Sequence, residues 1–126
     1  MLIGLSAILA CKDIERTAKF YENKLGFMSK KYLEAKEPHI CLYKDSVEII
    51  LIKILNGIFK PNHDLYGYGY DLYFYTKDQE KLEQELLKNG VKFIKRLNVT
   101  DYGNKEFVIE DTDGRYIAFG CKVKKG

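Results

Sequence analysis

Few side chains in this chain are of the types that act as nucleophiles, bases or soft metal ligands. There are two histidines and three cysteines. Cys11, Cys41 and Cys121 lie far apart and form no Cys-X-X-Cys pair, so we expect reduced thiols in the cytoplasm and neither a disulfide framework nor a zinc site. His39 is expected at a strand edge, with a catalytic base as the alternative, and His63 is expected in a loop.

Tyrosine is the other residue type of chemical interest, because its ring can stack on a flat ligand and its hydroxyl can orient that ligand. The chain has 10 tyrosines and no tryptophan. The densest cluster comprises Tyr66, Tyr68, Tyr70, Tyr73 and Tyr75. Tyrosine is also a common strand former, so this cluster indicates either a binding surface or ordinary strand structure.

The composition restricts the classes of protein that could carry these residues. With 126 residues, the chain is expected to form one domain or two very small fused modules. The net charge of +3, from 21 basic and 18 acidic side chains, disfavours binding of nucleic acid through phosphate contacts. No apolar stretch approaches the roughly 20 residues of a membrane span, and the N-terminal residues lack the basic segment of a signal peptide. We expect a cytoplasmic protein with no nucleic-acid partner and no membrane partner.

Two segments carry start and stop signals of helices. Asp13 can accept hydrogen bonds from the first free amides of one helix, and Gly26 can close its last turn. Asp78 and Gly90 mark a second helix in the same way, with a charged face expected in solvent. The apolar stripes are Ile14, Ala18, Tyr21 and Leu25 in the first helix and Leu82, Leu86 and Leu87 in the second.

Segments typical of strands surround both helices. They cover residues 2–10, 27–33, 39–43 and 47–54 in the first half and 72–76, 91–97, 106–110 and 115–121 in the second. Each half therefore has the order strand, helix and three strands, which indicates an internal duplication. We predict modules at 1–56 and 70–122, a linker at 57–69 and a basic tail at 123–126, all within one α+β domain.

Several short motifs support the duplication. Residues 12–14, 20–21 and 25–27 are Lys-Asp-Ile, Phe-Tyr and Leu-Gly-Phe, and residues 111–119 are Asp-Thr-Asp-Gly-Arg-Tyr-Ile-Ala-Phe. In this order they resemble the vicinal oxygen chelate superfamily, which includes glyoxalases, extradiol dioxygenases and the bleomycin-resistance proteins. The resemblance implies two βαβββ modules with curved sheets around a central cleft. Members commonly build this barrel from two chains, so a homodimer is expected, and the cleft lies either within one chain or across the dimer.

Metal-dependent members of that superfamily place one ligand on each of four strands. The ligands are a histidine early in each module and a carboxylate in its last strand. By resemblance, the histidine positions correspond to Ser6 and Asp71, and the carboxylate positions to Ala118 and, within one or two residues, Ile50. Only Asp71 could bind a divalent ion, so we expect no metal and no cofactor.

The remaining lining of the cleft follows from the alternation of side chains along a strand. If Asp71 and Ala118 face the cleft, so do Tyr73, Tyr75 and Tyr116. Around Ile50 the same rule adds Glu48, Ile52, His39, Cys41 and Tyr43. The predicted ligand-binding residues are Ser6, His39, Glu48, Ile50, Asp71, Tyr73, Tyr75, Tyr116 and Ala118.

The leading hypothesis is a small-molecule binding protein similar to the antibiotic-sequestering branch, without the usual metal site and without chemistry. Glu48 and Asp71 would favour a planar ligand that bears a cationic group. The alternative is an enzyme in which His39, Glu48 and Asp71 form an atypical metal site or an acid–base pair for lyase, isomerase or dioxygenase chemistry. A third hypothesis is a dimeric interaction module with a vestigial cleft.

Overall fold

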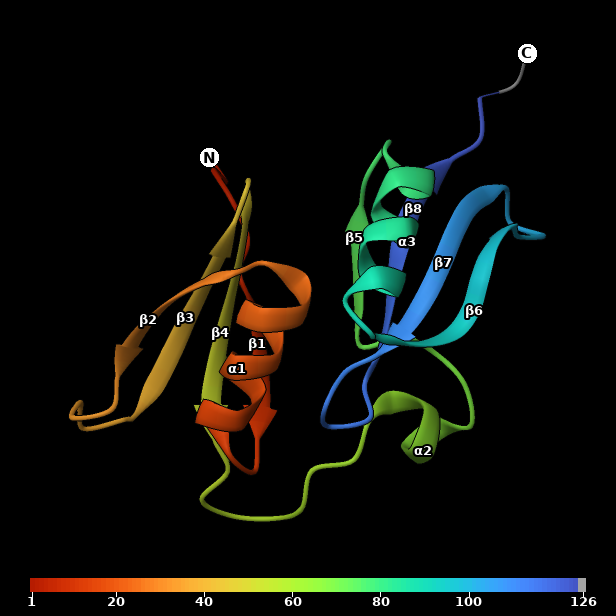
Figure 1. Cartoon of the computed structure of the whole chain (residues 1–126). Helices are drawn as coiled ribbons and strands as arrows, with labels where there is room; N and C mark the ends of the chain where they lie inside the picture. The colour runs from red at the N-terminus through yellow and green to blue at the C-terminus, as the bar shows by residue number, and fades with distance from the viewer. Residues whose placement is uncertain (125–126) are drawn as a thin grey trace. The chain divides into compact units, whose positions relative to one another are not determined.

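Each half of the chain folds into a four-stranded sheet that one longer helix accompanies, as Figure 1 shows for the computed structural model, which describes residues 1–124. The first unit ends at Phe59 and contains β1 (Ala7–Cys11), α1 (Ile14–Leu25), β2 (Met28–Tyr32), β3 (His39–Lys44) and β4 (Val47–Lys53). The second begins at Lys60 and contains α2 (Asn62–Tyr66), β5 (Leu72–Tyr75), α3 (Gln79–Lys88), β6 (Lys92–Val99), β7 (Asn104–Glu110) and β8 (Tyr116–Lys122).

The strand order is the same in both units. It is β1-β4-β3-β2 in the first sheet and β5-β8-β7-β6 in the second. In each, the first strand pairs in parallel with the last, and the other neighbours are antiparallel. The predicted duplication of a βαβββ module and the α+β class are therefore confirmed.

Helix α1 has the predicted ends. The Asp13 side chain accepts a hydrogen bond from the backbone N–H of Arg16, and Gly26 closes the helix in the left-handed conformation at φ 78°. The predicted apolar stripe is buried along its whole length. The capping residues and the apolar periodicity were sufficient to predict α1, because both depend on interactions between residues close together in the sequence.

Helix α3 differs from the prediction at its start and on its charged face. Asp78 precedes the helix, but its side chain makes no capping hydrogen bond. Glu83, expected in solvent, is only 6% exposed; its carboxylate accepts from Arg96 Nε at 3.0 Å and from the backbone N–H of Leu97 at 2.6 Å. Helix α3 is therefore attached to β6 by a buried carboxylate, which the charge pattern could not reveal.

Two other segments differ from expectation. Strand β1 begins at Ala7, so residues 2–6 are not part of the sheet. The stretch 57–69 contains the short helix α2, which the pattern of glycine and proline concealed. Residues 125–126 of the expected tail lie outside the described residues.

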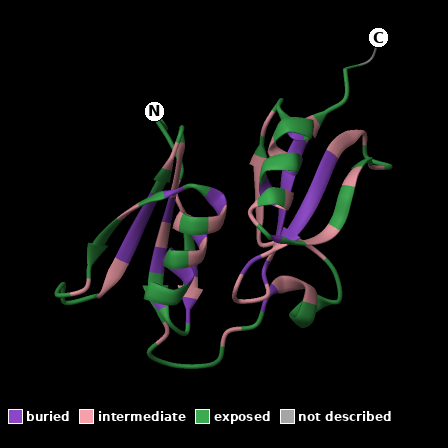
Figure 2. Cartoon of the chain, in the orientation of Figure 1, coloured by how far each residue is buried: buried purple, intermediate pink, exposed green. Residues whose placement is uncertain are grey.

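The second sheet has a strongly buried centre formed by β7 and β8 (Figure 2). On one face, the ring of Phe119 contacts those of Phe74 and Phe107, with centroids 5.1 Å apart in each of the two pairs. The alternate residues Tyr73 and Ala118, which are register partners, face the other way. One face thus forms an apolar core and the other is available for polar and aromatic groups.

None of the helices within residues 1–124 combines the length and the apolar character needed to cross a bilayer.

Candidate ligand-binding site

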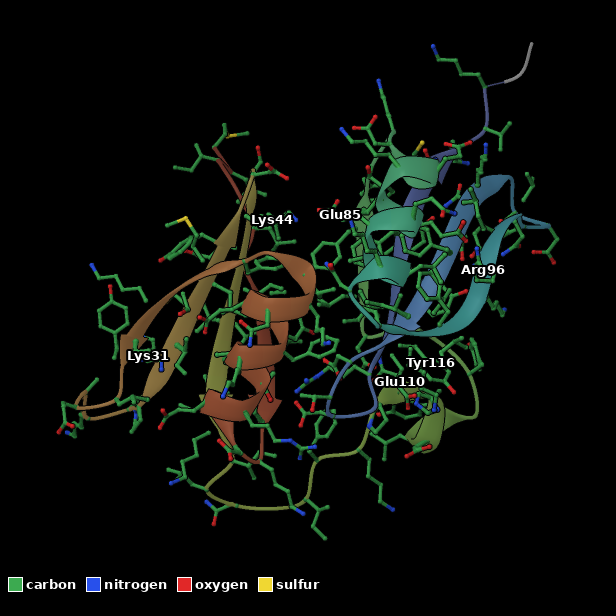
Figure 3. The ribbon with its side chains drawn as sticks, viewed as in Figure 1. Lys31, Lys44, Glu85, Arg96, Glu110 and Tyr116 are labelled. Atoms are coloured by element: carbon green, nitrogen blue, oxygen red, sulfur yellow. The ribbon has the colours of Figure 1, made fainter. Side chains whose placement is uncertain are left out.

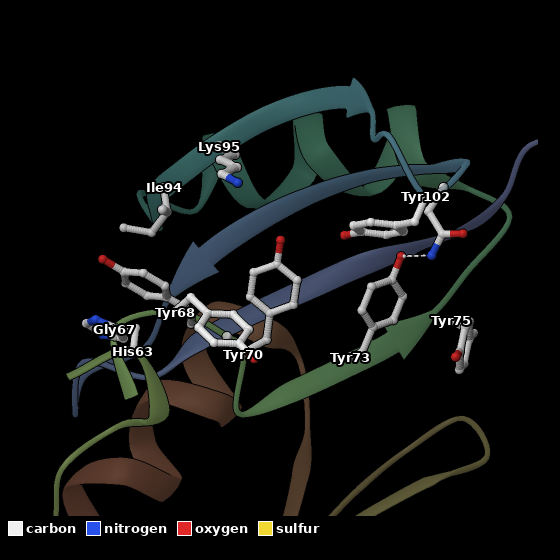
Figure 4. Close-up of a pocket in the computed structure, with 12 residues that line it drawn as sticks. His63, Gly67, Tyr68, Tyr70, Tyr73, Tyr75, Ile94, Lys95 and Tyr102 are labelled. Atoms are coloured by element: carbon white, nitrogen blue, oxygen red, sulfur yellow. Dashed lines mark hydrogen bonds between the residues drawn. The ribbon is translucent and has the colours of Figure 1, made fainter. Parts of the chain in front are cut away.

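A cavity of about 780 Å³ lies on the second sheet, and all of its lining comes from the second unit. Figure 4 shows it with tyrosine rings along its length, beside Ile94 and Lys95 of β6. The lining tyrosines are Tyr68, Tyr70, Tyr73, Tyr75, Tyr102 and Tyr116. A largely aromatic lining with a few polar groups is typical of sites for organic molecules.

Beneath these tyrosines lies Glu106 of β7, whose side chain is almost completely buried at 1% exposure. Its Oε1 accepts hydrogen bonds from the hydroxyls of Tyr73, at 2.9 Å, and Tyr102, at 2.6 Å, and its Oε2 accepts one from Tyr70 at 3.0 Å. Among the described residues no basic side chain forms an ion pair with it. Burying a carboxylate costs several kcal/mol, and here phenol hydrogen bonds offset that cost instead of a cation. We call Glu106 and its three tyrosine donors the Glu106 cluster.

Asn104 extends this cluster toward the cavity. The Tyr73 hydroxyl donates its proton to Glu106, so it can only accept from the Asn104 amide nitrogen, 2.8 Å away (Figure 4). This fixes the orientation of the amide and leaves Asn104 Oδ1 buried without a hydrogen-bond partner. An acceptor without a donor is costly in a protein interior and is often found at a functional site.

The turn between β6 and β7 holds Tyr102 and Asn104 in place. The Thr100 backbone N–H donates to the Asn104 carbonyl at 2.8 Å, and the Asn104 N–H donates to Thr100 Oγ1 at 3.1 Å. Gly103 has φ 85°, a left-handed conformation that a residue with a side chain adopts at a cost. A short local turn therefore places two cavity residues over the end of β7.

Gly120 of β8 provides the space for the Glu106 side chain. The two residues are register partners, so they share a face of the sheet. A Cβ at position 120 would lie 2.6 Å from Glu106 Cβ and 2.5 Å from the Lys105 carbonyl oxygen. Only glycine permits this approach, which ties Gly120 to the buried carboxylate.

The environment of the cluster keeps its phenols protonated. Burial and the hydrogen bond to Glu106 raise the pKa of Tyr73 to about 12. The pKa of Tyr102 is raised by burial first and then by Glu106, and burial also raises the pKa of Tyr70. All three tyrosines therefore remain hydrogen-bond donors to Glu106 around neutral pH.

Helix α2 forms the other end of the cavity. The imidazole of His63 stacks on the ring of Tyr116, with centroids 3.6 Å apart and an angle of 5° between the planes. The His63 Nε2 lies 2.8 Å from the Gly114 carbonyl oxygen. His63, expected in a loop, thus lies in a helix and lines the cavity.

The sequence-predicted residues of the second unit divide into two groups. Tyr73, Tyr75 and Tyr116 line the cavity. Ala118 is fully buried and is not part of the lining. Asp71 lies just before β5, where its Oδ1 accepts from the Asn62 backbone N–H at 3.2 Å and its Oδ2 has no hydrogen-bond partner.

The predicted residues of the first unit lie on one face of its sheet. His39 pairs with Ile52, and Ile50 pairs with Cys41. His39, Ile50 and Ile52 contribute to a separate cavity of about 480 Å³ near residues 35–37. The ring of His39 stacks on that of Tyr32 with centroids 4.9 Å apart, and its Nδ1 lies 2.8 Å from the Glu37 carbonyl oxygen.

Ser6 and Glu48 also lie together in the first unit. The Ser6 hydroxyl donates a hydrogen bond to the Glu48 carboxylate. Glu48, together with the side chain of Cys41 and burial, raises the pKa of Tyr43 to about 12, with Cys41 the largest cause. Glu48 and Ile50 are two residues apart in β4, so their side chains lie on the same face of the first sheet.

These residues do not suit the divalent metal that the resemblance implies for other members. A two-histidine, two-carboxylate site needs four donors, whereas Ile50 and Ala118 offer none and Ser6 is occupied with Glu48. Within residues 1–124, no three His, Cys, Asp or Glu side chains are grouped closely enough to hold a metal ion. The donor set does not fit the metal.

Sequence reasoning missed several important residues: His63, Lys95, Tyr102, Asn104 and Glu106. One signal could have identified Glu106, namely a charged residue at the start of the apolar segment Phe107–Ile109. Predicting that Glu106 lies opposite Gly120 requires the register of β7 and β8, which cannot be read from the sequence.

Two charged residues of this unit that form ion pairs, Arg96 and Glu110, are labelled in Figure 3. Arg96 lies along β6, where it forms the ion pair with Glu83 described above, and Glu110 pairs with Lys92 at 2.7 Å. These pairs neutralise other carboxylates near the site. Glu106 differs from them in having phenols as its hydrogen-bond donors.

Solved structures of other proteins share this fold. The chain is similar to UcmS2 (TM-score 0.74, 18% identity, covering 95% of this chain and 98% of that one). It is similar to TioX from Micromonospora sp. ML1 (TM-score 0.71, 14% identity, 94% and 98% covered). A superfamily member from Sphaerobacter thermophilus DSM 20745 aligns with TM-score 0.75 and 20% identity, covering 95% and 97%.

No curated protein sequence matches the chain at a significant level. The model of the Glyoxalase/Bleomycin resistance protein/Dioxygenase superfamily, however, matches residues 5–119, almost the entire length. Together with the duplicated βαβββ modules, this match shows that the chain belongs to the Glyoxalase/Bleomycin resistance protein/Dioxygenase superfamily.

Proposed function

We propose that this protein binds a flat organic small molecule in the tyrosine-lined cavity of its second unit, without a metal ion and without transforming it. The observation that carries the proposal is the 780 Å³ cavity with six tyrosines in its lining. Cavities of about 300–1,000 Å³ accommodate drug-sized ligands. The poor fit of the donor set to a divalent metal supports binding over the metal-dependent chemistry of other members.

A matched pair of variants tests this proposal. Tyr68 lines the cavity and is 81% exposed, so its truncation removes a stacking surface at little cost in stability. Tyr66 lies in the same segment, is 71% exposed and does not line the cavity. A panel of planar aromatic compounds is first screened by thermal shift, and the hits are measured by isothermal titration.

We expect Tyr68→Ala to weaken binding of a hit by roughly fivefold, the size of one aromatic contact, and Tyr66→Ala to leave it unchanged. Absence of binding across a broad panel overturns the proposal. Equal losses in both variants show that the compounds bind elsewhere and also contradict it.

Acid–base catalysis of the isomerase or lyase type is a second candidate. The supporting observation is that Tyr73 lines the cavity while its hydroxyl donates to the buried Glu106 carboxylate, an arrangement able to move a proton. Carbonyl compounds would be incubated with the protein in D₂O and followed by proton NMR. Loss of the α-proton signal with the wild type but not with Tyr73→Phe favours catalysis, whereas no exchange with either favours binding alone.

We further propose a homodimer, as the resemblance implied. The face of the first sheet that carries Ile50 also carries Ile8, its register partner, which is 63% exposed, and Ile52 at 40%. A second copy of the chain would cover these apolar side chains. We expect light scattering after size exclusion to give twice the chain mass for the wild type and for the control Ile58→Lys, and the monomer mass for Ile8→Lys. A monomeric wild type contradicts the proposal.

The three cysteines, Cys11, Cys41 and Cys121, form no disulfide. They support the proposal that the protein works in the reducing cytoplasm.

A further inference from the structure

The cavity contains tyrosine hydroxyls whose hydrogen bonds to the Glu106 carboxylate polarise them. Three phenols donate to the carboxylate of Glu106, so each phenol oxygen turns its lone pairs away from that carboxylate. Hydrogen bonding to an anion makes a phenol oxygen a better acceptor, because chains of hydrogen bonds polarise one another.

The negative charge of the cluster has no counter-ion in the described residues. Glu106 is buried, forms no ion pair in residues 1–124 and does not itself line the cavity. The lysine in the lining is Lys95, which lies beside Ile94 of β6 and apart from Tyr73 and Tyr102 in Figure 4. Because Lys95 is exposed, solvent screens its charge more than that of Glu106.

We infer that the cavity selects flat organic cations, such as a protonated aromatic amine, and that the buried Glu106 carboxylate supplies the selectivity through Tyr70, Tyr73 and Tyr102. The positive charge lies against the tyrosine rings and oxygens. This inference rests on the proposed binding function and adds the class of ligand. It also moves the anionic group from Glu48 and Asp71, where the sequence suggested it, to Glu106.

Three probes with the same tricyclic frame separate the contributions. At pH 8, acridine is neutral, 10-methylacridinium is a cation without an N–H group, and 9-aminoacridine is a cation with N–H groups. Their dissociation constants are measured by fluorescence titration. For the wild type we expect both cations to bind roughly tenfold more tightly than acridine.

Two variants assign the selectivity to residues. Glu106→Gln should abolish the preference for both cations over acridine and leave the affinity for acridine unchanged. Glu110→Gln is the matched control, because it removes the same charge from the same strand at a carboxylate already paired with Lys92, and it should keep the preference.

The outcomes separate this inference from the binding function itself. If acridine binds as tightly as the cations to the wild type, the inference fails and the binding function stands. If none of the three probes binds, the inference fails, and the broad panel of planar compounds decides the binding function separately. A preference for the cations that persists in a Glu106→Gln variant, shown by circular dichroism to be folded, also overturns the inference.

Discussion

Adding one methyl group at Gly120 should destabilise the second unit more than most single substitutions. In Gly120→Ala the new Cβ would lie 2.5 Å from the Lys105 carbonyl oxygen, 2.6 Å from Glu106 Cβ and 2.9 Å from Glu106 Cα. Two of these three atoms belong to the backbone of β7, so no change of side-chain rotamer relieves the clash. Strands β7 and β8 must separate locally, which disturbs the buried centre of the sheet and the carboxylate of Glu106.

Overpacking of a well-packed interior costs about 1–3 kcal/mol, and contact with backbone places this substitution at the upper end. A loss of about 3 kcal/mol lowers the melting temperature of a chain of this size by roughly 10 °C. Urea unfolding followed by circular dichroism gives the free energy of unfolding directly. Gly4→Ala is the control, because nothing lies within 4 Å of its Cβ, and it should be neutral. A Gly120→Ala variant within 0.5 kcal/mol of the wild type would refute the packing argument.

Three other predictions concern buried charges and phenols. Glu83→Ala should lower the free energy of unfolding by about 1–3 kcal/mol, because it removes the acceptor of the Leu97 backbone N–H and of Arg96. The control Glu85→Ala, on the exposed face of α3, should lower it by less than about 0.5 kcal/mol; urea unfolding measures both. Arg115→Met should lower the free energy of unfolding by about 3–5 kcal/mol, because Arg115 is 1% exposed and bridges the carboxylates of Asp111 and Asp113. An unchanged midpoint of urea unfolding would contradict this prediction. The raised pKa of Tyr73, about 12 against 10.0, means that the unfolded state loses its phenolic proton first. The free energy of unfolding should therefore be steady below pH 10 and fall toward pH 12, less steeply in Tyr73→Phe.

The elements of this fold could be predicted because their signals are local. Asp13 and Gly26 marked α1, and its apolar spacing named the buried stripe. Turns and alternation identified all eight strands, although β1 proved shorter and α2 was missed. The prediction of a cap at Asp78 was wrong, yet the helix formed, because packing of the α3 face can replace a missing local interaction.

The site was harder to predict, because it depends on which strands are neighbours. Tyr73, Tyr75 and Tyr116 line the cavity, as strand alternation predicted when it was counted from the positions that the resemblance assigned to Asp71 and Ala118. Glu106 and Asn104 become part of the site through pairing of β7 with β8 and through the conformation of the preceding turn. A count back from a helix cap gave Asp71 and Ser6, which the structure places outside the tyrosine-lined cavity.

The sequence by itself determined the duplicated βαβββ pattern, the ends of α1 and an aromatic face on the second sheet, because each follows from residue type and spacing along one segment. Only the tertiary structure decided where the buried charge lies. Glu106 reaches its phenols because strand register sets it opposite a residue without a side chain and because turns and α2 bring Tyr70 and Tyr102 over it. Those contacts join positions that are distant along the chain, and the energy that holds them together comes from packing, which a linear pattern does not encode.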